Sequence, residues 1–278
     1  MNHSSTERRG ANTRVCRVET QLGARRLANL LLLLATISLA TTAENELTPS
    51  LRWIEERGGE ITRDQQARVV GIRVDLAWVT DGDIARLAKL ADLKKLNLSF
   101  TLITDAGLER LSALRNVEEL DLSSAELLTD AAIAHIRRWK KLRVLNLRGT
   151  DVTDTSMEYI SSLPELESLD VSYTQVTNNG MEYLAPLAKL EKLSLGGNKI
   201  TGAGLHILKS LPRLKHLNLG GVQKRNSGLW AVTIADSGIE TVTGLKGLET
   251  LDLRGMRITE TAVDAIRKAH PACRVVWK

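Results

Sequence analysis

Hydrophobic residues recur along most of this chain in a short pattern with a period of about 24 residues. Segments 93–108, 142–157, 166–181 and 190–205 align without gaps, and in each an apolar residue is followed by others three and five positions later. The first apolar positions are Val69, Leu93, Val117, Leu142, Leu166, Leu190, Leu214, Leu248 and Cys273, at spacings of 24, 24, 25, 24, 24, 24, 34 and 25 residues. Such a period indicates a solenoid of stacked units.

Each unit predicts a short strand, a turn and a short helix. The alternating apolar positions predict the strand, and a Thr or Asn such as Thr101, Thr174 or Asn198 can bond free backbone groups in the turn. A Thr-Asp pair such as Thr153-Asp154 then predicts a helix N-cap. Apolar residues at every third position follow, which suits a short α or 3₁₀ helix with one buried stripe.

The units resemble leucine-rich repeats of the T-D-x-G-L type, as in residues 104–108. This type is shared by exported bacterial leucine-rich repeat proteins and by the repeat regions of F-box proteins. The resemblance covers Val69 to Lys278. It implies an α/β horseshoe solenoid with a parallel β-sheet on the concave face and short helices on the convex face. Only Cys273 supplies a cysteine to the repeats and no F-box precedes them, so the bacterial type is the nearer likeness.

Residues 1–43 predict a secretory signal peptide. Arg25-Arg26 precede an apolar run that includes Leu30–Leu34, and small residues near Ala40 and Ala43 follow. The alternative is an uncleaved anchor, although the run is shorter than the roughly 20 residues of a spanning helix. In both cases the repeats are expected beyond the cytoplasmic membrane, in the periplasm, the cell envelope or the medium.

Residues 44–68 predict an N-terminal cap, and residues 69–278 a domain of about eight repeats with a closing strand. Thr48 is expected to cap a short helix over 51–57 whose Trp53 and Ile54 face the first repeat, and residues 60–63 are expected to pair with 68–70. A cap is needed because an open solenoid end exposes a leucine layer and a strand edge.

The basic excess of the chain lies in its N-terminal segment. Residues 1–43 hold six Arg against two Glu, which leaves 32 basic and 31 acidic residues in the rest. The near-neutral remainder argues against a nucleic-acid partner. Cys16 lies in the predicted leader, and Cys273 is expected in the core as a small apolar residue, so no disulfide is expected in the exported chain.

No catalytic site, cofactor or metal is predicted. A row of polar residues follows the strands, but Asp121 and Asp170 would lie two strands apart, about 10 Å, which is too far to share one Ca²⁺. We therefore expect a hydrogen-bonded polar ladder. The histidines lie in different units, and no H-E-x-x-H, G-x-S-x-G, P-loop or C-x-x-C motif is present.

An insertion and a few strand-end residues are the candidate contacts. The seventh unit carries ten extra residues within 220–233, and insertions on repeat arrays tend to lie on the binding face. For the aromatic residues, the alternative is packing on neighbouring loops or on the solenoid flank. The candidate protein-contact residues are Phe100, Arg148, Tyr173, His216, Lys224, Arg225, Trp230 and Arg254.

The predicted function is a non-catalytic scaffold that binds a protein, or a surface glycan, through the concave face and the 220–233 loop. One alternative is a structural, self-associating cell-envelope protein. A further alternative, from the likeness to F-box repeat regions, is a substrate adaptor. We expect a monomer or weak self-association, with membrane contact only through an uncleaved N-terminal segment.

Overall fold

The computed structural model describes residues 51–75, 78–225, 227–234 and 236–278. The chain divides into two units, Met1–Arg52 and Trp53–Lys278, and the second, compact unit holds all the repeats. The predicted leader over 1–43 and the predicted cap residue Thr48 lie outside the described residues. Among the residues that are described, no helix combines the length and the hydrophobicity needed to cross a membrane.

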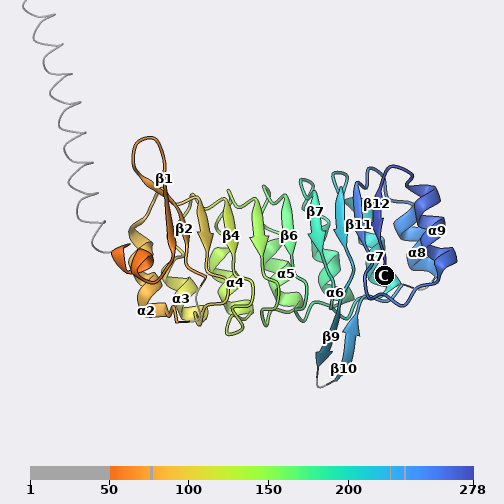
Figure 1. Ribbon diagram of the computed structural model, residues 1–278, viewed down its shortest axis with the longest axis horizontal. Helices are drawn as coiled ribbons and strands as arrows, with labels where there is room; N and C mark the ends of the chain where they lie inside the picture. Colours follow the sequence, from red (N-terminus) through yellow and green to blue (C-terminus); the bar gives the residue numbers. More distant parts are fainter. Residues whose placement is uncertain (1–50, 76–77, 226, 235) are drawn as a thin grey trace, which may run out of the picture. The chain divides into compact units, whose positions relative to one another are not determined.

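A single ten-stranded sheet forms one face of the second unit (Figure 1). The nine strands after β1 are parallel, and β1 pairs antiparallel with β2, as the sequence predicts for the segment before the repeats. The strands are β1 (Glu60–Arg63), β2 (Val69–Arg73), β3 (Lys95–Asn97), β4 (Glu119–Asp121), β5 (Val144–Asn146), β6 (Ser168–Asp170), β7 (Lys192–Ser194), β8 (His216–Asn218), β11 (Thr250–Asp252) and β12 (Arg274–Val276).

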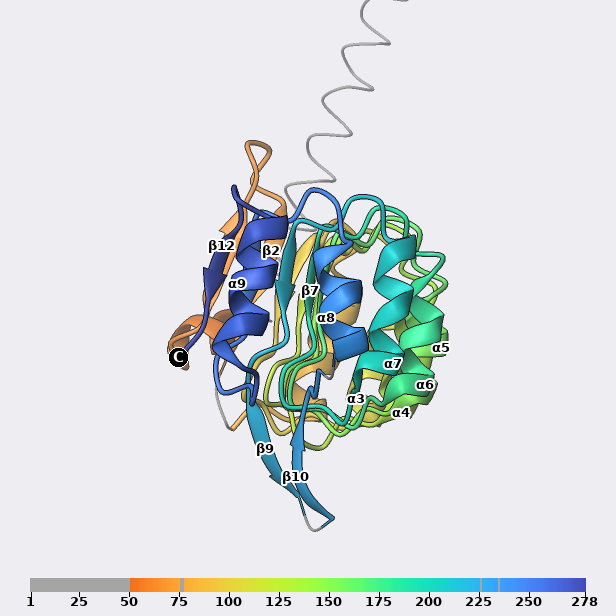
Figure 2. The same ribbon diagram turned by 90° about the vertical axis from the view of Figure 1, so that its right-hand side faces the viewer.

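Short helices cover the opposite face of the sheet (Figure 2). They are α2 (Asp81–Ile84), η1 (Ala85–Lys89), α3 (Asp105–Arg110), α4 (Asp130–Ile136), α5 (Asp154–Ile160), α6 (Asn178–Met181), η2 (Glu182–Leu184), α7 (Gly202–Leu205), η3 (His206–Ser210), α8 (Asp236–Thr243) and α9 (Glu260–Ala269). The leucines of successive strands, such as Leu96, Leu120 and Leu145, lie opposite one another and are buried beneath the helices. Each such side chain contributes about 1.5–3 kcal/mol by burial. The expected solenoid fold is confirmed.

The Asp of each Thr-Asp pair links its unit to the next unit. Asp154 begins α5, and its carboxylate accepts from the backbone N–H of Thr177 at 2.7 Å and from its Oγ1 at 2.6 Å. Asp81, Asp105 and Asp130 bond the corresponding Thr of the following unit in the same way. The Thr is the predicted N-cap, but the inter-repeat role of the Asp was not foreseen.

The same contact explains the Gly of the T-D-x-G-L pattern. A Cβ on Gly180 would lie 2.4 Å from Oδ1 of Asp154, and one on Gly107 would lie 2.2 Å from Oδ1 of Asp81. The glycine therefore leaves room for the carboxylate of the preceding unit. Where Ser156 takes this position, its hydroxyl donates to Asp130.

The polar row on the sheet differs from the predicted ladder. The side-chain oxygens of Asn97, Asp121 and Asp170 accept from the backbone N–H two residues later in the same unit, at 2.8–2.9 Å. These bonds run within a unit because the chain turns at the end of each short strand and leaves that N–H facing the side chain. The row therefore shapes the turns, whereas the Asp-Thr contacts connect the units.

The closing strand corrects the predicted place of Cys273. Thr250 pairs with Arg274 and Leu251 with Val275, so Cys273 lies beside Glu249, one residue past the first apolar position. Cys273 is half-buried rather than a core residue, and partial burial raises the pKa of its thiol. The predicted place was wrong because only residues 270–273 join α9 to β12, whereas 211–215 join η3 to β8, so the closing strand begins one residue earlier.

The insertion in the seventh unit is a β-hairpin rather than an irregular loop. Strands β9 (Val222–Arg225) and β10 (Gly228–Ala231) pair antiparallel, with Lys224 opposite Leu229 and Gln223 opposite Trp230. The hairpin projects beyond the ten-stranded sheet (Figure 1). It leaves the carboxyl end of β8, as the sequence predicts for the inserted residues.

Candidate binding surface

The outer face of the sheet carries a shallow groove of about 530 Å³ over its C-terminal half. Side chains from β6, β7, β8 and β11 line it, among them Asp170, Lys192, Ser194 and His216. They point outward because side chains alternate between the two sides of a strand and the leucines occupy the inner side. The groove is open to solvent, and it presents a wide polar floor rather than an enclosed pocket.

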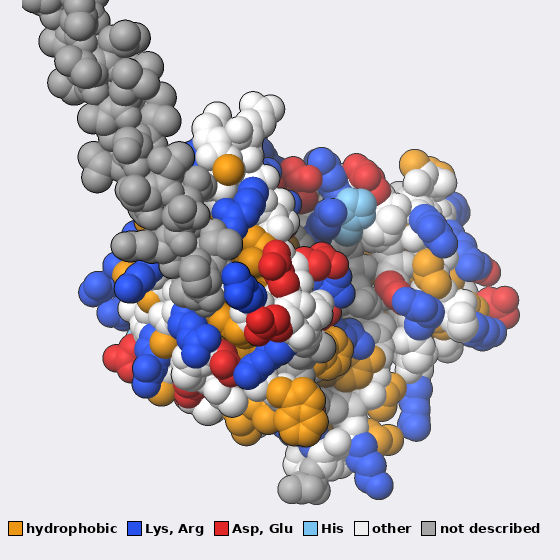
Figure 3. All heavy atoms as spheres, turned by 60° about the vertical axis from the view of Figure 1, so that its left-hand side comes forward, with side chains coloured by type: hydrophobic (Ala, Val, Ile, Leu, Met, Phe, Trp, Pro, Cys, Tyr) orange, Lys and Arg blue, Asp and Glu red, His pale blue; other side chains and the backbone are white. Residues whose placement is uncertain are grey.

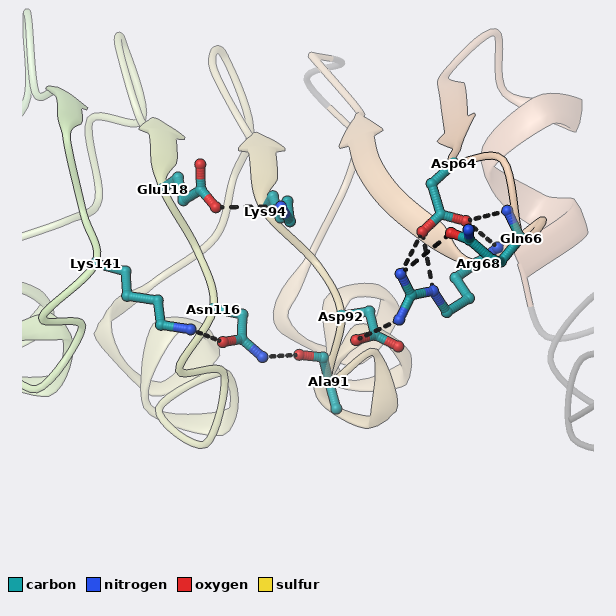
Figure 4. A network of polar contacts seen from close by, with 9 residues as sticks. All are labelled: Asp64, Gln66, Arg68, Ala91, Asp92, Lys94, Asn116, Glu118 and Lys141. Atoms are coloured by element: carbon teal, nitrogen blue, oxygen red, sulfur yellow. Dashed lines mark hydrogen bonds and ion pairs between the residues drawn. The ribbon is translucent and has the colours of Figure 1, made fainter. Parts of the chain in front are cut away.

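Most charges on the N-terminal half of this face are paired across neighbouring strands. Nζ of Lys95 lies 2.7 Å from Glu119. Lys94 lies 3.4 Å from Glu118, next to a polar network that begins at Asp64 and Arg68 (Figure 4). These pairs leave little uncompensated charge there.

The C-terminal half combines paired and unpaired charges. Arg143 bonds Glu167 at 2.7 Å, which holds the pKa of the Glu167 carboxyl below its usual range. Lys192 and Arg274, in contrast, have no carboxylate partner among the described residues. His216 bonds Oγ1 of Thr250 through Nδ1 at 2.9 Å. The groove thus holds two cations available for contacts from outside.

Three of the predicted contact residues meet in a second pocket, of about 360 Å³, at the carboxyl ends of the strands. Arg148, Tyr173 and Arg254 line it together with glycines of the turns. The Arg148 guanidinium lies 4.2 Å from the centre of the Tyr173 ring. Arg254 is bonded to Asp252 at 3.0 Å, and this contact lowers the pKa of the Asp252 carboxyl. The cation of Arg254 is therefore already compensated.

Tyr173 and Phe100 occupy the same left-handed turn position but have different surroundings. Their φ angles are +59° and +57°, where other units use Gly149, Gly197 or Gly255. A Cβ on Gly197 would lie 2.8 Å from the Tyr173 ring, so the ring packs on that turn. Phe100 is 60% exposed. The Tyr173 ring therefore packs on a neighbouring loop, whereas the Phe100 ring is exposed at the rim.

The inner side of the hairpin lies against these turns. Nε2 of Gln223 donates to the carbonyl of Tyr173 at 3.2 Å, and Arg225 lies 3.4 Å from Asp151. The Arg225 guanidinium also lies 5.5 Å from the half-buried ring of Trp230. Lys224 points to the other side and is exposed. The hairpin is therefore held to the edge of the solenoid by one face only.

Several surface residues were not anticipated from the sequence. The sequence does not distinguish Lys192 and Arg274 from the paired cations, because their lack of a carboxylate partner depends on which side chains the neighbouring strands bring close. Trp78, Leu102 and Leu127 are exposed although they are apolar. The sequence could have indicated them, because these apolar residues share one position in three successive units.

The family comparisons match repeats in this chain. Residues 140–200 match a leucine rich repeat family model, and residues 89–112 match a second leucine rich repeat model. A search of curated proteins found no match.

Solved structures that are similar to this one include the following two. Internalin C2 from Listeria monocytogenes has a TM-score of 0.57 at 22% identity, over 77% of this chain and 87% of that one. A leucine-rich repeat protein from Leptospira interrogans has a TM-score of 0.51 at 24% identity, over 69% of this chain and 45% of that one. At these identities the likeness shows the fold alone. Together with the 24-residue units and their register in the sheet, these matches make the chain a leucine-rich repeat protein.

Proposed function

We propose that this protein is a non-catalytic scaffold that holds a protein partner in the C-terminal half of its concave face. Leucine-rich repeat folds generally mediate protein–protein interaction. The observation that carries the proposal is the open groove containing Lys192 and Arg274, two cations without a carboxylate partner among the described residues. A broad polar surface of this kind suits a protein segment better than a small molecule, which requires a more enclosed pocket.

The partner presents acidic side chains to this groove. Its carboxylates bond Lys192 and Arg274, while uncharged donors and acceptors such as Ser194 and Asn218 are available to its backbone. The N-terminal half of the face is less suited to an acidic partner because Lys95 and Lys94 already bond glutamates. The hairpin follows β8 and lies at the carboxyl ends of the strands, beside the groove.

The site of action is proposed to lie beyond the cytoplasmic membrane. The support is the order of charged, apolar and small residues in 1–43. Sequencing the N-terminus of the protein recovered from its producing cells tests this proposal. A mature N-terminus near Glu44 is the expected result, whereas an intact Met1 on cytoplasmic protein would support the substrate-adaptor alternative.

Site-specific photo-crosslinking in the producing cells tests the groove. A photoreactive residue replaces Ser194, and the crosslinked products are compared among the parent, Lys192→Glu and Lys95→Glu. Lys95 and Lys192 begin β3 and β7, so they are matched in position but differ in pairing. We expect a protein adduct that Lys192→Glu reduces about tenfold and Lys95→Glu leaves unchanged. Equal adducts in all three proteins would rule out this groove as the site, and an adduct removed by glycosidase would favour a glycan.

A further inference from the structure

An apolar row lies exposed at the carboxyl ends of the first strands. The backbone bonds from Leu102 N to Val79 O, from Asp151 N to Leu128 O and from Gln175 N to Val152 O place one position of neighbouring units side by side. The pairing of β3 with β4 does the same for the second and third units. That position is occupied by Trp78, Leu102 and Leu127 in the first three units and by Asp151 and Gln175 in the next two. Trp78 is 80% exposed, and the two leucines are about half exposed.

Phe100 extends this row into a patch. It lies beside Leu102 in a left-handed conformation, which costs energy for any residue with a Cβ. The ring of Tyr173 packs on a neighbouring turn, whereas the ring of Phe100 is exposed. Trp78, Phe100, Leu102 and Leu127, here called the edge patch, expose roughly 500 Å² if each whole residue is taken as about 200 Å². Apolar side chains gather at the lower edge of the unit in the view of Figure 3.

The outer face of the hairpin is a second apolar surface on the same edge. Side chains alternate along its strands, so Gln223, Arg225 and Trp230 lie on the inner side and Val222, Lys224 and Leu229 on the outer side. Leu229 is 66% exposed, and Val222 is nearly half exposed. The hairpin follows β8 and the edge patch follows β2, β3 and β4, and the carboxyl ends of parallel strands lie on one edge of a sheet.

On this edge the hairpin projects from the C-terminal part of the solenoid, and the edge patch lies flat on the N-terminal part. The hairpin projects from the seventh unit, whereas the patch lies over the first three units. A second copy, turned by a two-fold axis, places its hairpin against the patch of the first copy and receives the first hairpin on its own patch. Each contact then occurs twice, as in a closed isologous dimer.

The charges beside the two surfaces are complementary. Glu126, next to Leu127, and Lys224, opposite Leu229 in the hairpin, are both exposed, and neither has an ion-pair partner within the described part of the chain. Two patches and two hairpin faces together remove on the order of 1,200–1,600 Å² from solvent, which reaches the standard size of a specific interface. The concave faces stay free in this arrangement.

We propose that two copies of this chain form a two-fold dimer in which the hairpin outer face of each copy docks on the edge patch of the other, with Lys224 facing Glu126. The dimer presents two concave faces and is independent of the partner proposed for the groove. Lys192→Glu therefore leaves it intact.

Sedimentation velocity of the full chain over a range of concentrations tests the proposal. The parent protein is expected to sediment as a dimer, and Glu126→Lys or Lys224→Glu alone to weaken the dimer about tenfold or more. A one-to-one mixture of these two variants is expected to recover the dimer, because every contact in the mixed pair is again Lys with Glu. Glu109→Lys, an exposed glutamate on α3, is the matched control and changes nothing.

Four results would overturn the proposal. They are a monomeric parent at every concentration, a dimer that neither charge reversal weakens, a mixture that fails to recover it, and a series of growing oligomers, which indicates an open head-to-tail chain. Leu229→Asp is a second variant for the case in which a charge reversal disturbs the hairpin itself. The proposal requires that Leu229→Asp also yields monomers and that its circular dichroism spectrum is the same as that of the parent. A parent that stays monomeric and binds neutral phosphatidylcholine vesicles would assign the patch to a lipid surface instead.

Discussion

Replacing Asp154 by Ala removes one link between two repeats without touching the leucine core. In the native protein the Asp154 carboxylate accepts from the N–H and the hydroxyl of Thr177 in the next unit. The variant leaves that N–H without its partner at a half-buried helix start. It also removes a negative charge from the first turn of α5, where it interacts favourably with the helix dipole.

The expected loss is about 2–4 kcal/mol of unfolding free energy. A hydrogen bond to a charged group contributes about 1.5–3 kcal/mol, and partial access of water to the site keeps two such bonds from adding fully. Asp154→Asn should cost less than about 1 kcal/mol, because the chain already uses Asn178 in the equivalent place. Asn178 accepts from Thr201 N at 2.9 Å and donates to its Oγ1 at 2.9 Å.

Urea unfolding followed by circular dichroism measures both variants. With an m value of about 2–3 kcal/mol per molar, Asp154→Ala lowers the midpoint by about 1 M. Glu158→Ala, at an exposed position of the same helix, is the control and should leave the midpoint in place. If Ala and Asn at position 154 were equally destabilising, or if Ala cost less than about 0.5 kcal/mol, the inter-repeat bond would not be the reason for the Asp.

Three further outcomes follow from the same contacts. Gly180→Ala should destabilise the native chain but stabilise the Asp154→Ala variant by up to about 1 kcal/mol, since a helix favours Ala over Gly once the carboxylate is gone. A change in unfolding free energy of the same sign in both backgrounds would contradict this account. Asn198→Leu should cost about 3 kcal/mol or more in urea unfolding, because the buried amide bonds Val171 O and Thr174 N. Arg254→Ala should raise the pKa of Asp252 in a carboxyl NMR titration. Since Arg254 lowers that pKa in the folded state, the associated stability is present above about pH 4 and is lost as the pH falls through the folded pKa. An unchanged pKa in the variant would rule out this pairing.

The repeat pattern alone predicted the strands, the Thr caps and the place of the insertion, because each depends on residues close in sequence. The positions of Leu96, Leu120 and Leu145 in a buried layer follow from a period that brings like positions together. Cys273 was misplaced by one residue because the link between α9 and β12, residues 270–273, is one residue shorter than the link 211–215 of the seventh unit. The repeat pattern alone does not show such a difference in link length, which becomes visible only in the pairing of the strands.

The candidate surface was only partly predictable. The row containing Phe100 and Tyr173 was recognised as a rim, but its left-handed backbone was not, although the glycines at the equivalent positions carried that signal. Whether an aromatic ring packs or remains exposed there depends on the next unit. Tyr173 has the bare turn of Gly197 beside it, whereas Phe100 remains exposed.

By itself the sequence determined the solenoid, its period and the alternation of buried and outward side chains, since these follow from hydrophobic burial at regular spacing. Only the tertiary structure decided which polar groups are already used. Asp154 bonds the next repeat and Lys95 bonds Glu119, while Lys192 has no carboxylate partner among the described residues. Such assignments depend on distances of a few ångströms between side chains about 24 residues apart, and stacking of the units sets those distances.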